Sequence, residues 1–200
     1  MTIAQPSPEE IVAFGSQIQE IGLEYSETPI SLRAGGQSHW YFDGRRAISN
    51  GHDLRTASEF IIVRADRENL DFNTVAGLGV GGRALASGVV MTAGDAGNQD
   101  LKWVHGNDDD SPGQRYGFGL HGTKVSTDCK VLVVDDTAST GDSLVTLIDM
   151  VRAEDGIVED AIVLVDRSQG ATEKRLGRIG VKFFALYEFI EEEGQIVPAA

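Results

Sequence analysis

The chain has 200 residues, of which 41% are hydrophobic, and its formal net charge is −14 at pH 7. This length and composition suit one domain with a buried core. The negative charge argues against nucleic-acid and anionic-membrane surfaces, which are bound through clustered Lys and Arg. We expect neither a signal peptide nor a membrane-spanning segment, because no apolar run is long enough. A single cysteine, Cys129, suits a reducing cytoplasm.

The first 68 residues predict two helices with a hairpin between them. Ser7-Pro8-Glu9-Glu10 is typical of a helix start, since Ser caps the free amides and Pro fits the first helical position. Residues 30–48 predict two strands around a Gly35-Gly36 turn, and residues 52–68 predict an amphipathic helix. The apolar face of the first helix is expected to comprise Ile11, Phe14, Ile18, Ile21 and Tyr25.

A glycine-rich turn follows the strand predicted at Thr74-Val75-Ala76. It reads Gly77-Leu78-Gly79-Val80-Gly81-Gly82, and a helix of small residues begins at Arg83. Four glycines in six positions allow backbone amides to approach an anion closely. The same pattern is equally compatible with a simple tight turn between a strand and a helix. A dinucleotide-binding fingerprint is less favoured, because it would come early in the chain with an acid about 20 residues later.

Residues 94–122 contain seven glycines and the three consecutive acids Asp108, Asp109 and Asp110. Lys102-Trp103-Val104 predicts a short strand within this region. The 106–119 loop is longer than ordinary connections, and such loops are often lids over a site.

The stretch Lys130–Ser143, KVLVVDDTASTGDS, combines a buried strand, a polar turn and a helix start. Its unbroken aliphatic run is typical of a strand buried on both faces of a parallel sheet. Asp135 and Asp136 are expected to end that strand, and a helix to begin near Asp142 or Ser143. Helix amides and four hydroxyls in one turn favour a phosphate, while two carboxylates suit a sugar diol or Mg²⁺. The plainer alternative, a strand end and a helix cap, does not explain the four hydroxyls.

Downstream, Ala161–Val165 predicts another buried strand, which ends at Asp166-Arg167. By position alone, this dipeptide also suits a surface ion pair. A short helix and a last strand at Val181–Leu186 are expected next, and the acidic residues 188–200 are expected to be a peripheral tail.

Strands and helices alternate from about residue 54, which predicts an α/β fold with a mostly parallel sheet flanked by helices. We expect one domain, with an N-terminal helix and hairpin hood over about 1–50, a core over about 51–187 and the tail. Ligands of such sheets bind at the carboxyl ends of the strands. The polar turns at 77–82, 135–143 and 166–167 should therefore share one rim.

The Lys130–Ser143 segment resembles the phosphoribosyl-pyrophosphate (PRPP) signature of type I phosphoribosyltransferases. Other segments make the chain similar to orotate phosphoribosyltransferases over roughly residues 28–187. The resemblance implies transfer of ribose 5-phosphate from Mg²⁺-PRPP to orotate, giving orotidine 5′-monophosphate and pyrophosphate in pyrimidine nucleotide biosynthesis. It also implies a homodimer.

The resemblance assigns roles to particular residues. Asp135 and Asp136 are the catalytic pair and would hold the ribose hydroxyls, while Mg²⁺ would be bound mainly through PRPP. Arg167, Ser38 and Tyr41 would contact the base. The pyrophosphate loop would be Gly79, Val80, Gly81 and Gly82, and the 5-phosphate would be held by Thr137, Ala138, Ser139, Thr140, Gly141, Asp142 and Ser143.

Two departures from the family pattern keep other functions open. Gln37 stands where the family has a substrate-contacting lysine, and no residue of the acidic 106–119 loop matches the family's loop lysine. A phosphoribosyltransferase for another base is one alternative. A non-catalytic regulator that binds PRPP or a nucleotide is the other.

Overall fold

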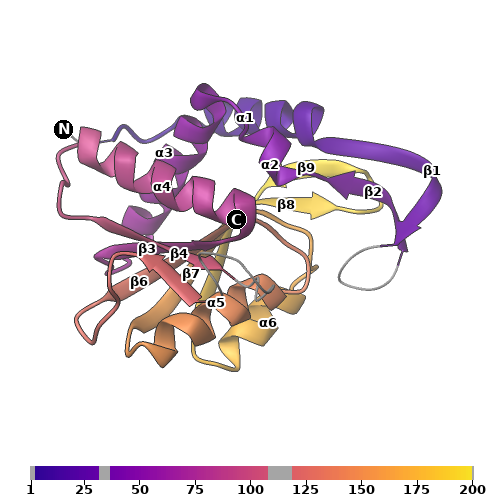
Figure 1. The fold of residues 1–200 in the computed structure, drawn as a ribbon. Coiled ribbons are helices and arrows are strands. Elements are labelled where there is room, and N and C mark those ends of the chain that lie inside the picture. Colours follow the sequence, from indigo (N-terminus) through magenta and orange to yellow (C-terminus); the bar gives the residue numbers. More distant parts are fainter. Residues whose placement is uncertain (1–2, 32–36, 108–118, 200) are drawn as a thin grey trace, which may run out of the picture.

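The computed structural model describes residues 3–31, 37–107 and 119–199 (Figure 1). Seven strands form one sheet in the order β5-β4-β3-β6-β7-β8-β9. The five inner strands are parallel, and β5 and β9 pair antiparallel at the two edges. The predicted mostly parallel sheet is confirmed. Its strands are β3 (Thr74–Leu78), β4 (Lys102–Asn107), β5 (Gly119–Gly122), β6 (Lys130–Ala138), β7 (Ile157–Asp166), β8 (Lys182–Ile190) and β9 (Gln195–Pro198).

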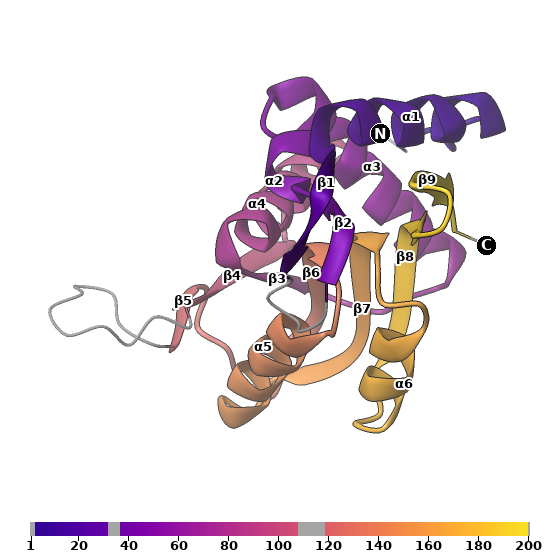
Figure 2. The ribbon, with the colours of Figure 1, turned by 90° about the vertical axis from the view of Figure 1, so that its right-hand side faces the viewer.

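Helices cover both faces of the sheet, as Figures 1 and 2 show. Leu132 and Val134 pack on one face, while Val131 and Val133 pack on the other. Because successive residues of a strand point to opposite faces, a strand covered on both sides requires the uninterrupted aliphatic run of β6. One face carries α3 (Gly51–Arg67) and α4 (Gly79–Asp95), with α1 (Pro8–Gly22) beside them, and the other carries α5 (Asp142–Ala153) and α6 (Ala171–Gly177).

The first helix begins as predicted but ends earlier than its apolar pattern indicated. The Glu10 amide donates to Ser7 Oγ at 3.2 Å, and the Ser7 amide donates to Glu10 Oε2 at 2.7 Å. The helix stops at Gly22, where an added Cβ would lie 2.7 Å from the Phe42 ring. Tyr25, expected on the helix face, instead lies in a strand and is 60% exposed.

The N-terminal hairpin is formed by β1 (Leu23–Ser31) and β2 (Gln37–Phe42), which pair antiparallel. It starts well before residue 30, and its predicted Gly35-Gly36 turn lies outside the described residues. The short helix α2 (Gly44–Ala47) follows β2. In Figure 2 the hairpin lies in front of the sheet. Arg167, which follows β7, donates to the Trp40 carbonyl of β2 at 3.0 Å, so the hairpin is joined to the strand ends.

The described part of the expected tail, residues 188–199, is not peripheral, so that expectation is wrong. β8 continues to Ile190, β9 pairs beside it, and Phe189 and Ile196 are buried in the core. The Ile196 amide also donates to Gln19 Oε1 of α1 at 2.6 Å. Alternate residues of a strand point to opposite faces, so Phe189 and Ile196 can be buried although four of the thirteen residues at 188–200 are acidic, and composition alone predicted a solvated segment.

Strands β4 and β5 flank the region predicted to be a long loop. The short strand predicted at 102–104 is confirmed and extends to Asn107, and β5 begins at Gly119. Residues 108–118 of the predicted loop lie outside the described part of the chain. Among the helices of the described ranges, none is long and apolar enough to cross a bilayer.

Ile196→Ala is expected to lower the free energy of unfolding by about 2–3 kcal/mol, because it leaves a cavity where β9 meets the core. Urea denaturation measures the change. Ile157→Ala is the matched control, since Ile157 is 42% exposed and its truncation should cost about 0.5 kcal/mol or less. Equal effects of the two variants would contradict the packing of β9.

Candidate functional site

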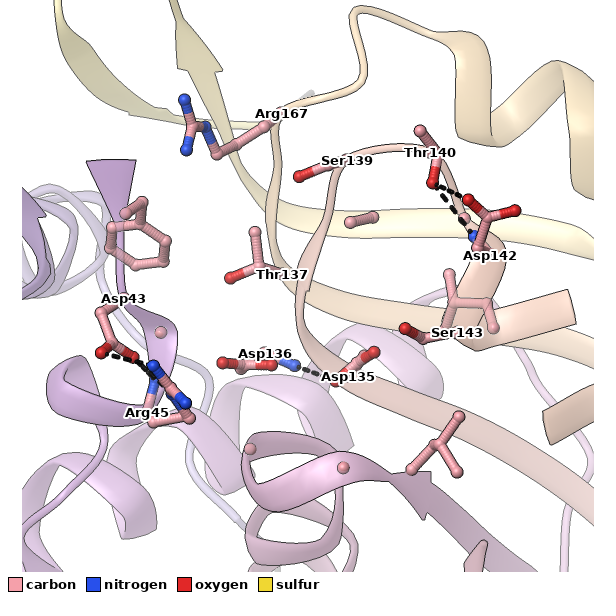
Figure 3. A pocket seen from close by; sticks show the side chains of 18 of the residues that line it. Asp43, Arg45, Asp135, Asp136, Thr137, Ser139, Thr140, Asp142, Ser143 and Arg167 are labelled. Carbon is pink, nitrogen blue, oxygen red and sulfur yellow. Dashed lines mark hydrogen bonds and ion pairs between the residues drawn. The ribbon is translucent and has the colours of Figure 1, made fainter. Parts of the chain in front are cut away.

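A cavity of about 480 Å³ lies at the carboxyl ends of the central strands. Four segments line it: Tyr41–Arg45 of the hood, Leu78–Gly81 at the start of α4, Asp135–Leu144 between β6 and α5, and Arg167 after β7. Figure 3 shows labelled side chains from three of these segments around one space. The predicted convergence of the three polar turns on one rim is therefore observed, and the hood closes a further side.

Asp135 and Asp136 do not end their strand, contrary to expectation. β6 runs on to Ala138, which pairs with Asp166 of β7. The Asp136 amide donates to Asp135 Oδ1 at 3.0 Å, and Asp135 is 7% exposed. The two carboxylates thus belong to the wall of the cavity and not to a solvated turn.

Glycines from two other segments make room for this carboxylate pair. A Cβ on Gly81 would lie 2.3 Å from Asp136 Cγ, and a Cβ on Gly44 would lie 2.5 Å from Asp136 Oδ2. Gly82 is similarly placed against Asp135 Oδ1, at 2.9 Å. Glycine is required at these positions because any side chain would displace an acid. Sequence reasoning missed Gly44, for which the signal was a glycine two residues after the end of β2.

Burial raises the pKa of the Asp135 and Asp136 carboxyls. It raises the pKa of Asp135 well above its ordinary value, and the charge of Asp136 raises it further. Burial also raises the pKa of Asp136, although the hydrogen bond with Asp135 and the charge of Arg45 oppose the change. Two partly desolvated acids side by side favour hydrogen-bond donors or a cation as ligands.

The turn after β6 leads into the N-terminus of α5, and a helix N-terminus favours an anion. α5 begins at Asp142, as predicted, and Gly141 before it has φ 74°. Asp142 accepts from Thr140 Oγ1 at 2.6 Å and pairs with Arg175 Nη1 of α6 at 2.6 Å. The arginine offsets an acid that would otherwise repel a phosphate at this position. Arg175 was not predicted, because nothing in its local sequence marks it.

Thr137 provides a second feature that suits a polar ligand. Its Oγ1 is buried and has no hydrogen-bond partner among the described residues. Buried hydroxyls in folded proteins normally have a partner. Because Thr137 lines the cavity, a bound ligand is the natural partner.

The side chain of Arg167 is buried, so the alternative of a surface ion pair at Asp166-Arg167 is wrong. Its side chain is 6% exposed, and its Nη2 lies 3.5 Å from Glu191 Oε2. The guanidinium carbon lies 4.7 Å from the centre of the Phe189 ring. Burial lowers the pKa of Arg167, and the charge of Glu191 opposes that change.

The hood brings Tyr41 to the cavity but not Ser38. Arg45 donates to the Tyr41 hydroxyl at 3.4 Å and holds Asp43 through two contacts of 2.8 Å, which lowers the pKa of Asp43. Ser38 is buried on the opposite face of β2, where its hydroxyl bonds Glu191. Residues 38 and 41 are separated by an odd number of positions, so one strand cannot turn both to the cavity.

Asp135→Asn is expected to raise the free energy of unfolding more at pH 8 than at pH 4.5. A carboxyl whose pKa is raised on folding contributes stability that is complete below its unfolded value, here 3.8, and is lost as pH rises through the folded value. Asn carries no charge and avoids this loss. Urea denaturation of both proteins at the two pH values measures the difference, and an equal effect at both would contradict it.

Comparison with known proteins agrees with this architecture, although no family model matches the chain. Orotate phosphoribosyltransferase of Sulfurisphaera tokodaii is 31% identical over 163 residues, which are 80% of this chain and 76% of the relative. Its counterpart from Cenarchaeum symbiosum is 33% identical over 162 residues, with the same two coverages. The orotate phosphoribosyltransferase of Mycobacterium tuberculosis H37Rv in complex with PRPP superposes with a TM-score of 0.67 at 20% identity, covering 88% of this chain and 93% of that one. The Aeropyrum pernix enzyme gives a TM-score of 0.66 at 21% identity, covering 88% and 94%. The chain therefore belongs to the orotate phosphoribosyltransferase family, within the type I phosphoribosyltransferases.

Proposed function

We propose that the protein transfers ribose 5-phosphate from PRPP to orotate, giving orotidine 5′-monophosphate and pyrophosphate in pyrimidine nucleotide biosynthesis. One observation carries the proposal: the acid pair, the hydroxyl-rich turn, the glycine turn and Arg167 line a single cavity. Each suits a different part of the two substrates. The relatives named above are orotate phosphoribosyltransferases, which supports the same reaction.

The PRPP half of the site lies on β6 and the two helix starts. Asp135 and Asp136 accept hydrogen bonds from the ribose hydroxyls. The turn 137–143 and the first amides of α5 hold the 5-phosphate, because a helix N-terminus favours an anion. The pyrophosphate lies against residues 79–82, where α4 begins and Gly79 has φ 66°.

Mg²⁺ fits the cavity as a companion of PRPP. The ion is usually bound through one or two carboxylates together with substrate phosphates, so PRPP would supply most of its ligands, and Asp135 and Asp136 are the carboxylates that would complete them beside the ribose hydroxyls. Within the described ranges, no group of three or more His, Cys, Asp or Glu is placed to hold a metal. When bound, Mg²⁺ supplies positive charge to the departing pyrophosphate.

The base half of the site lies under the hood. Arg167 offers a guanidinium that can recognise a carboxylate, and Tyr41 lines the same cavity. Ser38 acts indirectly, because its hydroxyl donates a hydrogen bond to Glu191, the acid that pairs with Arg167. The base-binding role is thus assigned to Arg167 and Tyr41 directly and to Ser38 indirectly.

Catalysis in this arrangement depends on orientation and charge. The bond between ribose C1 and the pyrophosphate oxygen breaks while a bond from C1 to the base nitrogen forms, and the transition state resembles an oxocarbenium ion. The base nitrogen releases its proton, which the departing pyrophosphate or water accepts. The protein holds both substrates in line and stabilises the leaving anion through backbone amides. No covalent intermediate with a side chain is required.

A second candidate is transfer to a base without a carboxylate, because Arg167 already has an acidic partner in Glu191. The resemblance further supports a homodimer, and the single cysteine supports a cytoplasmic location. Incubation of the purified protein with Mg²⁺-PRPP and either orotate, uracil or adenine separates the candidates. Formation of orotidine 5′-monophosphate and pyrophosphate is the expected result. PRPP binding without product from any base would favour a regulator and overturn the proposal.

The double variant Asp135→Asn with Asp136→Asn is expected to weaken PRPP binding at least tenfold, about 1.4 kcal/mol, because amides accept from the ribose diol less strongly than carboxylates. Calorimetric titration with Mg²⁺-PRPP measures the affinity, and circular dichroism confirms the fold. An unchanged dissociation constant would remove the ribose assignment.

Arg167→Ala is expected to raise the KM for orotate by about 10- to 100-fold, as for a lost hydrogen bond to a charged group. PRPP affinity should change much less, because the turn 137–143 lies elsewhere in the cavity. Steady-state kinetics and PRPP titration on the same sample separate the two effects. Equal losses for both substrates would show that Arg167 supports the whole site and does not select the base.

A further inference from the structure

We infer that Glu191 is a positioning residue that sets the preference between anionic and neutral bases, by sharing the guanidinium of Arg167. The inference rests on the proposed function, in which Arg167 meets the base. It assigns a role in specificity to the turn between β8 and β9, outside the residues that line the cavity.

The geometry links three parts of the chain that are distant in sequence. Glu191 directly follows β8, and its Oε2 lies 3.5 Å from Arg167 Nη2. Its other oxygen, Oε1, accepts a hydrogen bond from Ser38 of the hood. The same Arg167 nitrogen donates to the Trp40 carbonyl at 3.0 Å. Ser38 thus holds the Glu191 carboxylate in place, and Glu191 together with Trp40 sets the orientation of Arg167.

The burial of Arg167 strengthens its interaction with the charge of Glu191. The side chain of Arg167 is 6% exposed, whereas that of Glu191 is 37% exposed. A desolvated guanidinium interacts strongly with the first carboxylate beside it. A second carboxylate, brought by an anionic base, must then share a cation that is already paired. A neutral base that needs only hydrogen-bond donors does not face this competition.

The orientation of Arg167 does not depend on the charge of Glu191 alone. The Trp40 carbonyl and the Phe189 ring, 4.7 Å from the guanidinium carbon, are both neutral contacts. An amide keeps one oxygen, which can accept from Arg167 in place of Glu191 Oε2. Its NH2 group takes the place of Oε1 and can donate to Ser38 Oγ, whose own proton can go to the Trp40 carbonyl at 3.0 Å. Glu191→Gln therefore removes the charge and leaves the packing intact, which separates an electrostatic role from a structural one.

The experiment compares the wild type with Glu191→Gln, Glu191→Asp and a control, Glu192→Gln. Glu192 is exposed in the same turn and forms no ion pair with the described residues, so its variant removes an equal charge nearby. Calorimetry measures the binding of orotate and of uracil in the presence of Mg²⁺ and pyrophosphate. Steady-state assays with saturating Mg²⁺-PRPP give KM and kcat.

Glu191→Gln should tighten orotate binding about fivefold, as for loss of a partly exposed charge pair, with uracil binding and kcat unchanged. Glu191→Asp and Glu192→Gln should resemble the wild type. Weaker orotate binding in Glu191→Gln, or an equal change for both bases, would overturn the inference. Tighter orotate binding without product from any variant would sink the proposed reaction and keep the inference. Product formation with unchanged orotate binding in Glu191→Gln would keep the proposed reaction and overturn the inference. If no variant binds orotate, both the reaction and the inference are overturned.

Discussion

Two adjacent carboxylates lie near the carboxyl end of the central strand, where burial removes much of their hydration, and the other parts of the site surround this desolvated pair. Asp135 is 7% exposed, and burial raises the pKa of both acids. Gly44 and Gly81 bring two other backbone segments into contact with Asp136. The cavity therefore combines two carboxylates in its wall with a hydroxyl-rich turn and a glycine turn, and a ligand that carries hydroxyls, phosphates and a divalent cation complements this lining.

The side of the cavity at Arg167, which we propose binds the base, depends on a different constraint, the burial of that arginine side chain. Arg167 is held by the hood through Trp40 and by the β8–β9 turn through Glu191. A substrate in the cavity would thus be in contact, directly or through one residue, with the N-terminal hairpin, the parallel core and the carboxy-terminal strand pair.

The sequence predicted those features whose physical cause is local. The aliphatic run of β6, the start of α5 at Asp142 and the cap at Ser7 each follow from a few neighbouring residues. Convergence of the polar turns followed from the rule that parallel strands end at one edge. Contacts between distant segments were not predictable in this way. Arg175 pairs with Asp142 from another helix, and the acidic composition of residues 188–200 concealed the buried Phe189 and Ile196.

The contacts of α1 also affect the order in which the chain folds during synthesis. The Tyr187 hydroxyl donates to the Ile11 carbonyl at 2.8 Å, and the Ile196 amide bonds Gln19, so this helix packs on strands made more than 170 residues later. Contacts this distant in sequence slow folding, because a long loop must close before they form. During synthesis α1 can pack early on α2, the hairpin and Phe60 of α3, but its contacts with β8 and β9 form only when the end of the chain has left the ribosome. The part of its apolar face that packs on Tyr187 stays uncovered until then, and exposed apolar surface of this kind is what chaperones bind.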